Sequence, residues 1–561
     1  MESGNRDKTK QKNIHKLSAL LPDASLERTR QNLKDLKAMV EESARLGEKI
    51  NQLVADIRQA AAPDGQPFIF TNSLDENKQL LKVVFRDCED IKMRSFSLYG
   101  KPVLLVYLDG MADTIMLGES IMKTFAEESS AQSASSLASI VNLQTLINEQ
   151  LSVADVTIVS NAATAIESVM AGKALLLLDG PPEVLVIGAV KHVKRSVQKG
   201  AEDVIRGPHD AFNETLNDNI VLIRRRSKDY NVKVRILQVG LRTKTSVAVV
   251  YVADLVKPGL VEEVERRLAK VKVDRVLASK MIEEQIVEHP WTPFPQLQET
   301  ERPDKTVAAI YEGQVAIIVD NTPATMLVPC TYNLIMQTPE DYTTPPLIAS
   351  LIRFSRHISA FIAIYLPAIY VAVVSYHPGL IPTTMAISIA ELRSRTPFPS
   401  FLEAFAMEIL LELFQEAIIR MPQKVAGAAA VVGALVIGTT VVQAGLVNPF
   451  LVVVTAMTAI ASYNMPSWGF GLALRFFRIP LLILASILGL YGVMIGLLAI
   501  TVHLCSIKNF GQSYLGGMFN FTLLEDWADQ LVRLPQRWLG ARPKELGSQD
   551  RDRQGETFEQ T

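Results

Sequence analysis

Three long stretches without a charged residue restrict the possible folds of this chain more than any other feature of its 561 residues. Residues 358–390, 425–474 and 479–507 contain 33, 50 and 29 residues without Asp, Glu, Lys or Arg. About 20 apolar residues cross a bilayer as a helix, and apolar runs inside soluble proteins are usually shorter. The sequence therefore predicts an integral membrane protein. The 50-residue run must hold two spans, and Asn448 and Pro449 mark the break between them.

The residues before 358 have the composition of a soluble protein. The whole chain has a net charge of −2, from 57 basic and 59 acidic residues, which argues against binding of nucleic acid. Its three cysteines lie too far apart for a metal cluster or a disulfide framework. The N-terminal segment is polar and lacks the apolar core of a signal peptide, so we expect the first domain to stay in the cytoplasm.

Short apolar runs alternate with helical patterns after residue 65, which predicts α/β structure. Three of these runs, at 104–110, 175–180 and 316–321, end at an Asp-Gly or Asp-Asn pair and are expected to be buried strands that stop at turns. Residues 220–227 and 246–255 are also expected to be strands, and 261–286 to be helical. The predicted fold is a two-lobed α/β cytosolic N-terminal domain followed by an all-α transmembrane domain with several spans. The expected parts are a charged helical arm (1–64), two α/β subdomains (65–194 and 195–345, the second with a Pro-rich connector at 288–304), the transmembrane domain (346–507) and a polar, amphipathic tail (508–561).

No catalytic or cofactor-binding motif is found in the sequence. The seven histidines lack metal-ligand spacing, and the glycine-rich patterns of nucleotide-binding loops are missing. Arg224, Arg225 and Arg226 are expected on a solvated or ion-paired strand edge. We therefore expect no enzyme activity, no metal and no cofactor.

The first span is expected at 358–376, with Arg353 and Arg356 on its cytoplasmic side. Residues 377–390 are too short and too rich in proline for a span and are expected to be re-entrant or interfacial. The last span is expected at 480–503, after an inside loop that ends at Arg475 and Arg478. Five or six crossings remain possible, and so do both sides of the membrane for the C-terminus.

A helix predicted at 400–420 carries three carboxylates on one stripe, at Glu408, Glu412 and Glu416. A charged side chain that faces lipid at mid-membrane is costly, so the stripe must face water, a partner or an arginine, and Arg420 can pair with Glu416. The helix either lies in the membrane interface or supplies an acidic vestibule that concentrates cations at a pore mouth.

The helix predicted at 425–447 has two distinct faces. One face repeats a small residue every fourth position, which favours close helix packing; its members are Ala426, Ala430, Ala434 and Gly438. The other face combines two valines with a hydroxyl and an amide, which either form interhelical hydrogen bonds or line a pore; its members are Val432, Val436, Thr439 and Gln443.

Several motifs together resemble the A-subunit of GerA-type nutrient germinant receptors of endospore-forming bacteria. The motifs that carry the resemblance lie at 106–123, 204–226, 289–304, 312–329, 396–423 and 431–466. The resemblance implies a multi-pass protein of the spore inner membrane, with its N-terminal domain on the core side. It also implies a complex with a transporter-like B-subunit and a lipoprotein C-subunit, and self-association into a ring oligomer that releases cations when nutrients bind.

This sequence departs from the family pattern at 206–212, at Gly438 and Thr439, and at 509–514, so it is either a divergent receptor subunit or a related paralogue that acts later. The favoured interpretation is a subunit that forms or gates a cation channel. The alternative is a membrane signalling scaffold or transporter-like subunit without a pore.

Overall fold

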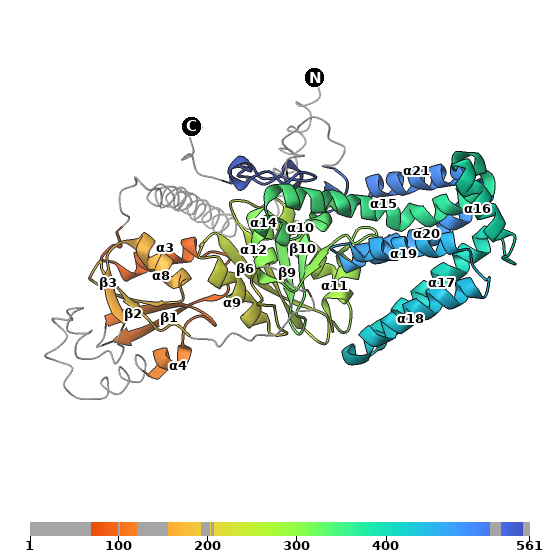
Figure 1. Ribbon diagram of the computed structural model, residues 1–561. Coiled ribbons are helices and arrows are strands. Elements are labelled where there is room, and N and C mark those ends of the chain that lie inside the picture. Colours follow the sequence, from red (N-terminus) through yellow and green to blue (C-terminus); the bar gives the residue numbers. More distant parts are fainter. Residues whose placement is uncertain are drawn as a thin grey trace, which may run out of the picture. The chain divides into compact units, whose positions relative to one another are not determined.

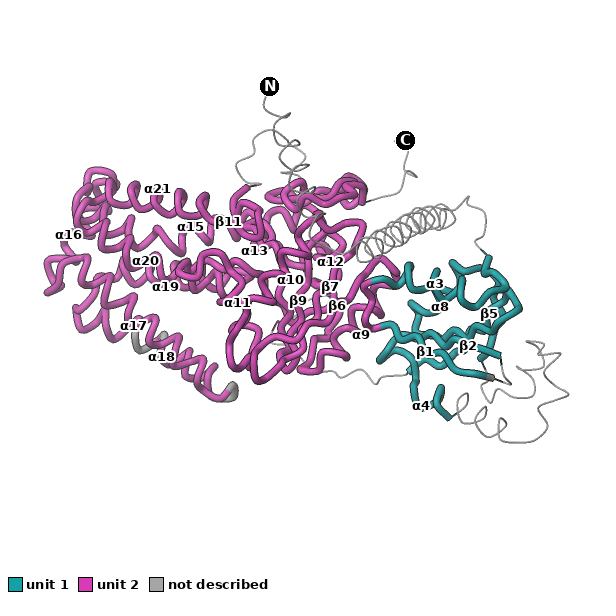
Figure 2. The backbone as a smooth tube through the Cα atoms, turned by 180° about the vertical axis from the view of Figure 1, so that it is seen from behind, with its two compact units in different colours: residues 1–86, 91–191 teal, residues 87–90, 192–561 magenta. Residues whose placement is uncertain are grey.

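The computed structural model describes residues 69–98, 101–119, 155–191, 202, 207–516 and 529–553. The chain divides into two compact units, one with residues up to 86 and 91–191 and the other with 87–90 and the residues from 192 onward (Figure 2). The predicted N-terminal arm, 1–64, lies outside the described residues.

The first unit is a five-stranded sheet with helices packed on it. Every paired strand is antiparallel, and the order across the sheet is β1-β2-β4-β5-β3. The elements are α3 (Leu74–Val84), β1 (Ile91–Leu98), β2 (Lys101–Leu108), α4 (Thr114–Leu117), β3 (Val156–Val159), α8 (Ala162–Met170), β4 (Ala174–Leu178) and β5 (Val184–Ile187).

The second unit begins with a sheet of the same topology, in the order β6-β7-β9-β10-β8. Helices α10 and α11 pack on one face of this sheet, and α9 and α12 pack on the other. The elements are α9 (Leu216–Arg226), β6 (Val232–Val239), β7 (Thr245–Val252), α10 (Leu260–Lys270), α11 (Ser279–Ile286), β8 (Gln298–Thr300), α12 (Pro303–Tyr311), β9 (Val315–Val319) and β10 (Thr325–Val328).

The two α/β lobes repeat one another in detail. In the first, the amide of buried Asn77 bonds the backbone of Thr71, and Asp179 accepts from the N–H of Leu74. In the second, buried Asn219 bonds the backbone of Asn213 in the same way, and Asp320 accepts from the N–H of Leu216. The chain therefore contains an internal structural repeat, which the sequence pattern alone does not show.

The three predicted strand-to-turn junctions are confirmed as β2, β4 and β9. The residues that follow their aspartates, Gly110, Gly180 and Asn321, have φ of 78°, 111° and 64°. Glycine and asparagine tolerate this left-handed region best, which explains the choice of residues at these turns.

The strand predicted at 220–227 is wrong, because these residues form the end of α9. The apolar positions Leu216, Ile220 and Ile223 recur at helical spacing and are buried. Arg224 is fully buried and forms a bidentate ion pair with Asp90, in which its Nε and Nη2 atoms donate to the two carboxylate oxygens at 2.7 and 3.0 Å.

The helical part of the second unit follows two short helices, α13 (Tyr332–Met336) and α14 (Glu340–Thr343) (Figure 1). Its helices are α15 (Pro346–Tyr376), α16 (Thr383–Arg393), α17 (Ser400–Arg420), α18 (Gln423–Gln443), α19 (Pro449–Tyr463), α20 (Trp468–Leu488) and α21 (Leu490–Ser506). Among the described residues, α15, α18 and α20 are long and apolar enough to cross a membrane, and α19 and α21 are shorter apolar helices. The predicted break at Asn448 and Pro449 is confirmed, since α19 begins there with Asn448 as its N-cap.

The last span predicted from the sequence is wrong. Residues 480–503 form parts of two helices, which turn at Gly489, where φ is 62°. The two helices pack closely because glycines face the neighbouring helix: a Cβ at Gly496 would lie 2.6 Å from a methyl group of Leu481. Residues 468–478 belong to α20, with Ser467 as its N-cap, and do not form the predicted loop, so Arg475 and Arg478 lie within a helix.

The chain returns to the second α/β lobe after α21. The small hairpin of β11 (Lys508–Asn509) and β12 (Gln512–Ser513) packs there, with Asn509 Nδ2 donating to the carbonyl oxygen of Cys330 at 3.1 Å. The tail, with short helices η3 (Gln536–Trp538) and η4 (Lys544–Leu546), continues along the lobe: Arg542 Nε donates to the carbonyl oxygen of Tyr311 and Ser548 Oγ to that of Glu312. Both ends of the helical part therefore meet the same lobe.

Candidate functional site in the helical part

Helix α18 lies at the rim of the helical part and packs against α17 (Figure 1). In the most apolar 18-residue window of α15 and of α20, 44% of the residues are buried, whereas in α18 the share is 0%. An apolar helix that buries so little of itself within its own chain requires lipid or another chain around it.

The predicted polar face of α18 is open. Val432 is 61% exposed, and the side chains of Thr439 and Gln443 are exposed as well. Thr439 Oγ1 donates to the carbonyl oxygen of Leu435 at 2.7 Å, so its hydroxyl is satisfied within its own helix. The side chain of Val436, the fourth member of this face, lies outside the described residues.

The predicted small-residue stripe is half-buried at Ala426, Ala430 and Gly438, and the side chain of Ala434 lies outside the described residues. Another small residue of α18, Gly433, packs against Phe414 of α17. A Cβ there would overlap the ring of Phe414 on α17, so a larger residue at 433 would force this ring to move.

A cavity of about 290 Å³ lies between α17, α18 and α19. Its walls are largely apolar and include Phe414, Gly438 and Ile460. Gln415 also lines it: this side chain is 5% exposed, and its Oε1 atom has no hydrogen-bond partner among the described residues. The contact between α18 and its neighbours is therefore incompletely packed.

The three carboxylates of the predicted acidic stripe lie in three different environments. Glu408 is buried and forms an ion pair with Arg478 of α20, at 2.6 Å. Glu412 is about half exposed and lies 3.7 Å from Arg475 Nη1. Glu416 is exposed and bonds Arg420 at 2.6 and 2.8 Å, the pairing that the sequence predicts.

Arg478 ties together four helices at the level of Glu408. Its Nη1 donates to Glu408 on α17, its Nε to the carbonyl oxygen of Ala363 on α15 at 2.8 Å, and its Nη2 to Ser462 Oγ on α19 at 2.6 Å. A charge inside a membrane helix is costly unless it is paired, and such residues often mark functional positions. The sequence does not reveal this pair, because its members lie 70 residues apart and because the charge pattern predicts a loop at Arg478.

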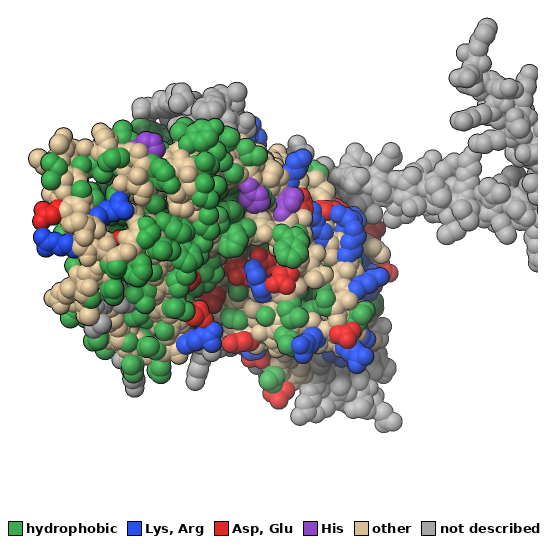
Figure 3. Space-filling model, turned by 90° about the vertical axis from the view of Figure 1, so that its right-hand side faces the viewer, with side chains coloured by type: hydrophobic (Ala, Val, Ile, Leu, Met, Phe, Trp, Pro, Cys, Tyr) green, Lys and Arg blue, Asp and Glu red, His purple; other side chains and the backbone are tan. Residues whose placement is uncertain are grey.

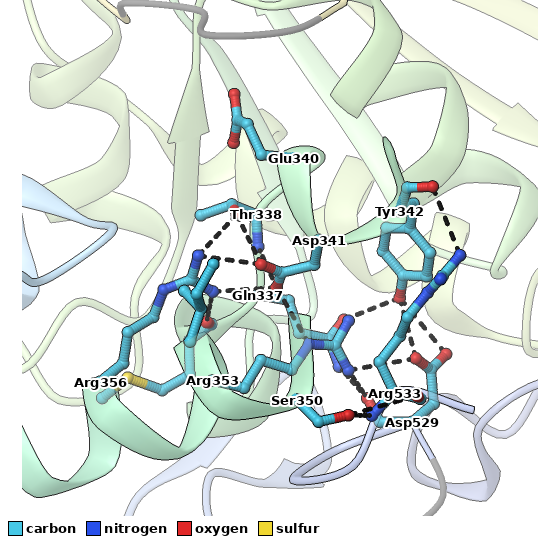
Figure 4. A network of polar contacts seen from close by, with 12 residues as sticks. Gln337, Thr338, Glu340, Asp341, Tyr342, Ser350, Arg353, Arg356, Asp529 and Arg533 are labelled. Carbon is cyan, nitrogen blue, oxygen red and sulfur yellow. Dashed lines mark hydrogen bonds and ion pairs between the residues drawn. The ribbon is translucent and has the colours of Figure 1, made fainter. Parts of the chain in front are cut away.

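A second buried ion cluster lies where the α/β lobe passes into α15 (Figure 4). Asp341 on α14 accepts from Arg353 Nε and from both terminal nitrogens of Arg356, each at 2.9 Å. Burial by itself would raise the pKa of Asp341, but the hydrogen bonds and charges of Arg356 and Arg353 outweigh burial and hold that pKa below its ordinary value. The two arginines expected to mark the cytoplasmic side of the first span are thus engaged in the fold itself.

The C-terminal tail joins this cluster (Figure 4). Asp529 Oδ1 lies 3.2 Å from Arg353 Nη1 and 3.1 Å from the hydroxyl of Tyr342. Arg533 lies over the ring of Tyr342 and donates to the backbone of 342 and 344, while Arg553 bridges Asp529 and Glu312. The tail therefore fastens the first membrane helix to the α/β lobe.

Within the described residues, no group of three or more His, Cys, Asp or Glu side chains could hold a metal ion. The three cysteines are free, with Cys88 and Cys330 buried and Cys505 exposed.

Comparison with known proteins identifies the family to which this architecture belongs. The family model described as Bacillus/Clostridium GerA spore germination protein matches residues 79–545.

The chain belongs to the GerA family.

Two relatives extend over most of the chain. An uncharacterized membrane protein, YfkQ, of Bacillus subtilis (strain 168) is 35% identical over 498 residues, which cover 88% of this chain and 94% of that protein. Spore germination protein GerLA of Bacillus cereus is 34% identical over 464 residues, covering 82% of this chain and 93% of that protein. The crystal structure of the N-terminal domain of the A subunit of the Bacillus megaterium spore germinant receptor GerK3 covers 48% of this chain and 98% of that domain, with 25% identity and a TM-score of 0.38.

The GerA match includes the Glu408–Arg478 pair, the cluster around Asp341 except Arg553, the α17–α18 pair and the tail up to residue 545. The α/β N-terminal part followed by a helical part confirms the predicted fold class. Membership in this family and the apolar helices together establish a membrane protein related to spore germination proteins.

Proposed function

We propose that this GerA-family chain is a membrane subunit of a spore germinant receptor and that it forms or gates an oligomeric cation channel in response to nutrients. It acts in the inner membrane of the spore, with its α/β lobes on the core side. A transporter-like B-subunit and a lipoprotein C-subunit are its partners, and copies of the chain assemble as a ring.

The observation that carries the proposal is the exposure of α18. This helix is apolar enough to cross a membrane, yet 0% of its apolar window is buried within the chain, where Gly433 packs on the ring of Phe414 of α17. If copies surround a central path, α18 gains the neighbours that it lacks. Its face with Val432, Val436, Thr439 and Gln443 then lines that path, and the stripe of Ala426, Ala430, Ala434 and Gly438 packs towards neighbouring helices.

The route of the chain supports six crossings. Helices α15, α17, α18, α19, α20 and α21 would each cross once, leaving α16 on the far side. Asn464, just after α19, bonds Ser359 near the lobe, whereas Tyr376 at the end of α15 bonds the backbone of Ser486 at the far end of α20. An even number of crossings fits the packing of 508–516 and of the tail on the α/β lobe, and it puts the described part of the tail on the same side of the membrane as that lobe.

The acidic stripe gives the proposed path its charge preference. Glu412 and Glu416 are exposed at the end of α17 nearer to the α/β lobe, where carboxylates raise the local concentration of cations. Glu408, the third member of the proposed vestibule, is held by Arg478 and contributes by fixing the direction of α17.

The test uses single cysteines on α18 in a Cys505→Ser background, since the other two cysteines are buried. Thr439→Cys and Gln443→Cys are treated with a charged, membrane-impermeant thiol reagent in the assembled receptor. Val453→Cys and Leu498→Cys, exposed apolar positions on α19 and α21, are the controls. A pore wall is wet, so modification at 439 and 443 should greatly exceed that at 453 and 498, and it should alter potassium release.

Equal protection of all four positions would refute the pore assignment. The chain would then be a signalling scaffold or transporter-like subunit of the same receptor, with α18 packed against a partner.

A further inference from the structure

Trp291 is almost completely exposed, at 97%, although tryptophan is usually a well-buried side chain in a folded lobe. It lies at the tip of the segment between α11 and β8. A large apolar ring held in this way is available for contact with a membrane or a partner outside the lobe.

The neighbours of Trp291 fix its position along the membrane helices. Thr292 Oγ1 lies 2.8 Å from Nε2 of His503, in the last turn of α21. The ring of Phe294 stacks on Phe477 of α20, with centroids 5.0 Å apart, and Pro295 lies 3.7 Å from the Cβ position of Gly469. Trp291 is therefore held beside the lobe-side ends of α20 and α21, where membrane proteins concentrate tryptophan at the boundary between lipid and water.

The second lobe also carries a cluster of basic side chains, which we name the basic loop pair. It consists of the turn between β6 and β7 (240–244) and the connection between α10 and α11 (270–280). Three backbone hydrogen bonds join the two segments, from the N–H groups of Leu241, Arg242 and Thr243 to the carbonyl oxygens of Val273 and Asp274. The exposed basic residues of the pair are Arg242, Lys244, Lys270, Lys272, Arg275 and Lys280.

Few carboxylates neutralise this cluster. Asp274 is the sole acidic residue of the two segments and lies 3.7 Å from Arg242, and Lys280 pairs with Glu283. Among the residues that the structure describes, Lys244, Lys270, Lys272 and Arg275 have no ion-pair partner. Two leucines stand out between them, Leu241 at 59% and Leu277 at 61% exposed.

The layer of α10 and α11 is also the layer that meets the helical part. Phe510, just after α21, packs among the buried residues of these two helices, and Arg267 of α10 lies 4.1 Å from its ring centroid. Figure 3 looks at the molecule from the far end of the helical part, and Lys and Arg side chains are visible on the surface beside the apolar helices.

We propose that the α10–α11 face of the second lobe is a docking surface for anionic phospholipid headgroups. Trp291 anchors it at the interface, Leu241 and Leu277 enter the headgroup layer, and the unpaired basic side chains bind phosphate groups. Unpaired basic charge beside exposed apolar side chains is the combination that holds proteins on anionic membranes, and each basic residue near such a surface strengthens attachment about fivefold.

The test uses the full chain in nanodiscs, in the Cys505→Ser background, with one spin label at a time. The labelled variants are Trp291→Cys, Leu277→Cys and, as a control on the opposite face of the sheet, Ala308→Cys on α12. Collision with oxygen, which partitions into lipid, is compared with collision with a water-soluble nickel chelate. The discs contain either zwitterionic phosphatidylcholine alone or phosphatidylcholine with one third phosphatidylglycerol.

The expected result is that the label at 291 is shielded from nickel in both kinds of disc, because the helix ends fix its depth. The label at 277 should become shielded, by at least threefold, only in the anionic discs. Adding Lys272→Gln and Arg275→Gln should abolish that lipid dependence, whereas Lys228→Gln and Lys305→Gln, on the α9–α12 side, should leave it intact. The label at 308 should stay accessible throughout.

Equal nickel accessibility of the label at 277 in the two kinds of disc would overturn the lipid assignment. So would a label at 291 as accessible as the one at 308. Both outcomes are independent of whether α18 lines a pore.

Discussion

The buried pair of Glu408 and Arg478 supports a quantitative prediction about the helical part. In Arg478→Met the partner of Glu408 Oε2 disappears, and the other oxygen, Oε1, has no hydrogen-bond partner among the described residues. The variant thus leaves a carboxylate that is only 5% exposed without its cation, and it also frees the carbonyl oxygen of Ala363 and the hydroxyl of Ser462.

The expected cost is set by burial. Removing one member of a buried ion pair typically lowers the free energy of unfolding by about 3–5 kcal/mol, because an uncompensated charge stays behind. Replacing both members with apolar side chains is often nearly neutral, so Glu408→Leu with Arg478→Met should recover most of the loss. The exposed pair of Glu416 and Arg420, on the same helix, offers a matched control: Arg420→Met should cost about 0.3–0.5 kcal/mol.

The measurement is denaturant-induced unfolding of the purified chain in mixed micelles, with all variants at the same pH and detergent composition. The expected order of stability is Arg420→Met near the parent protein, the double variant slightly below it, and Arg478→Met far below. A loss under about 1 kcal/mol for Arg478→Met would mean that Glu408 is solvated, and the argument from burial would fail. A double variant as unstable as Arg478→Met would show that the side chains act by shape and not by charge.

Three further predictions follow from single contacts. Asp341→Asn should lower the free energy of unfolding by about 3 kcal/mol at pH 7. Because the folded-state pKa of Asp341 lies below its unfolded value, this stabilisation is present above about pH 4 and is lost as the pH falls through the depressed value. The melting temperatures of variant and parent should therefore converge in acid. Gly433→Ala should separate α17 from α18, because its Cβ meets the ring of Phe414. Gly427→Ala has open space around its Cβ and should gain up to about 1 kcal/mol of helix stability. The yield of cross-linking between the two helices should therefore fall in the first variant and stay unchanged in the second. Gly313→Ala should cost about 1 kcal/mol or more and loosen the tail, since φ there is 97° and the Cβ would lie 2.6 Å from Ser548 Oγ. Limited proteolysis after residue 529 measures the release of the tail. A tail as protected as in the parent protein would contradict this prediction.

Much of the fold could be predicted because local chemistry determines it. Runs such as 175–180 are continuously apolar and end at Asp-Gly, so a few neighbouring residues determine both a buried strand and a left-handed turn. Pro449 breaks the apolar run wherever the rest of the chain lies, because proline lacks the backbone N–H.

The errors arose where the partner is distant in sequence. Residues 220–227 combine an apolar run with three arginines, a pattern that also fits a strand edge. The helical spacing begins before this run, at Leu216, and Asp90, which pairs with the buried Arg224, lies 134 residues away. The same holds for Arg478, which resembles a loop arginine until Glu408, 70 residues away, is placed beside it. A glycine such as Gly489 is ambiguous in an apolar run, because glycine both breaks soluble helices and packs membrane helices.

These contacts divide the helical part into a fixed and a less constrained portion. Arg478 joins α15, α19, α20 and the first half of α17. The first turn of α17 is also held, because Glu403 accepts hydrogen bonds from the Thr396 hydroxyl and from the N–H of Asn448. Beyond Glu408 the carboxylates of α17 turn to the outside, and α18 rests on Phe414 beside an incompletely packed cavity. Displacement of α18 therefore breaks no ion pair within the part of the chain that the structure describes, and its cost is set by apolar contacts such as that with Phe414. Under the proposed function, a partner subunit that binds one position of α18 better than another would shift the helix by its difference in affinity for the two positions, which is what a ligand-controlled gate requires.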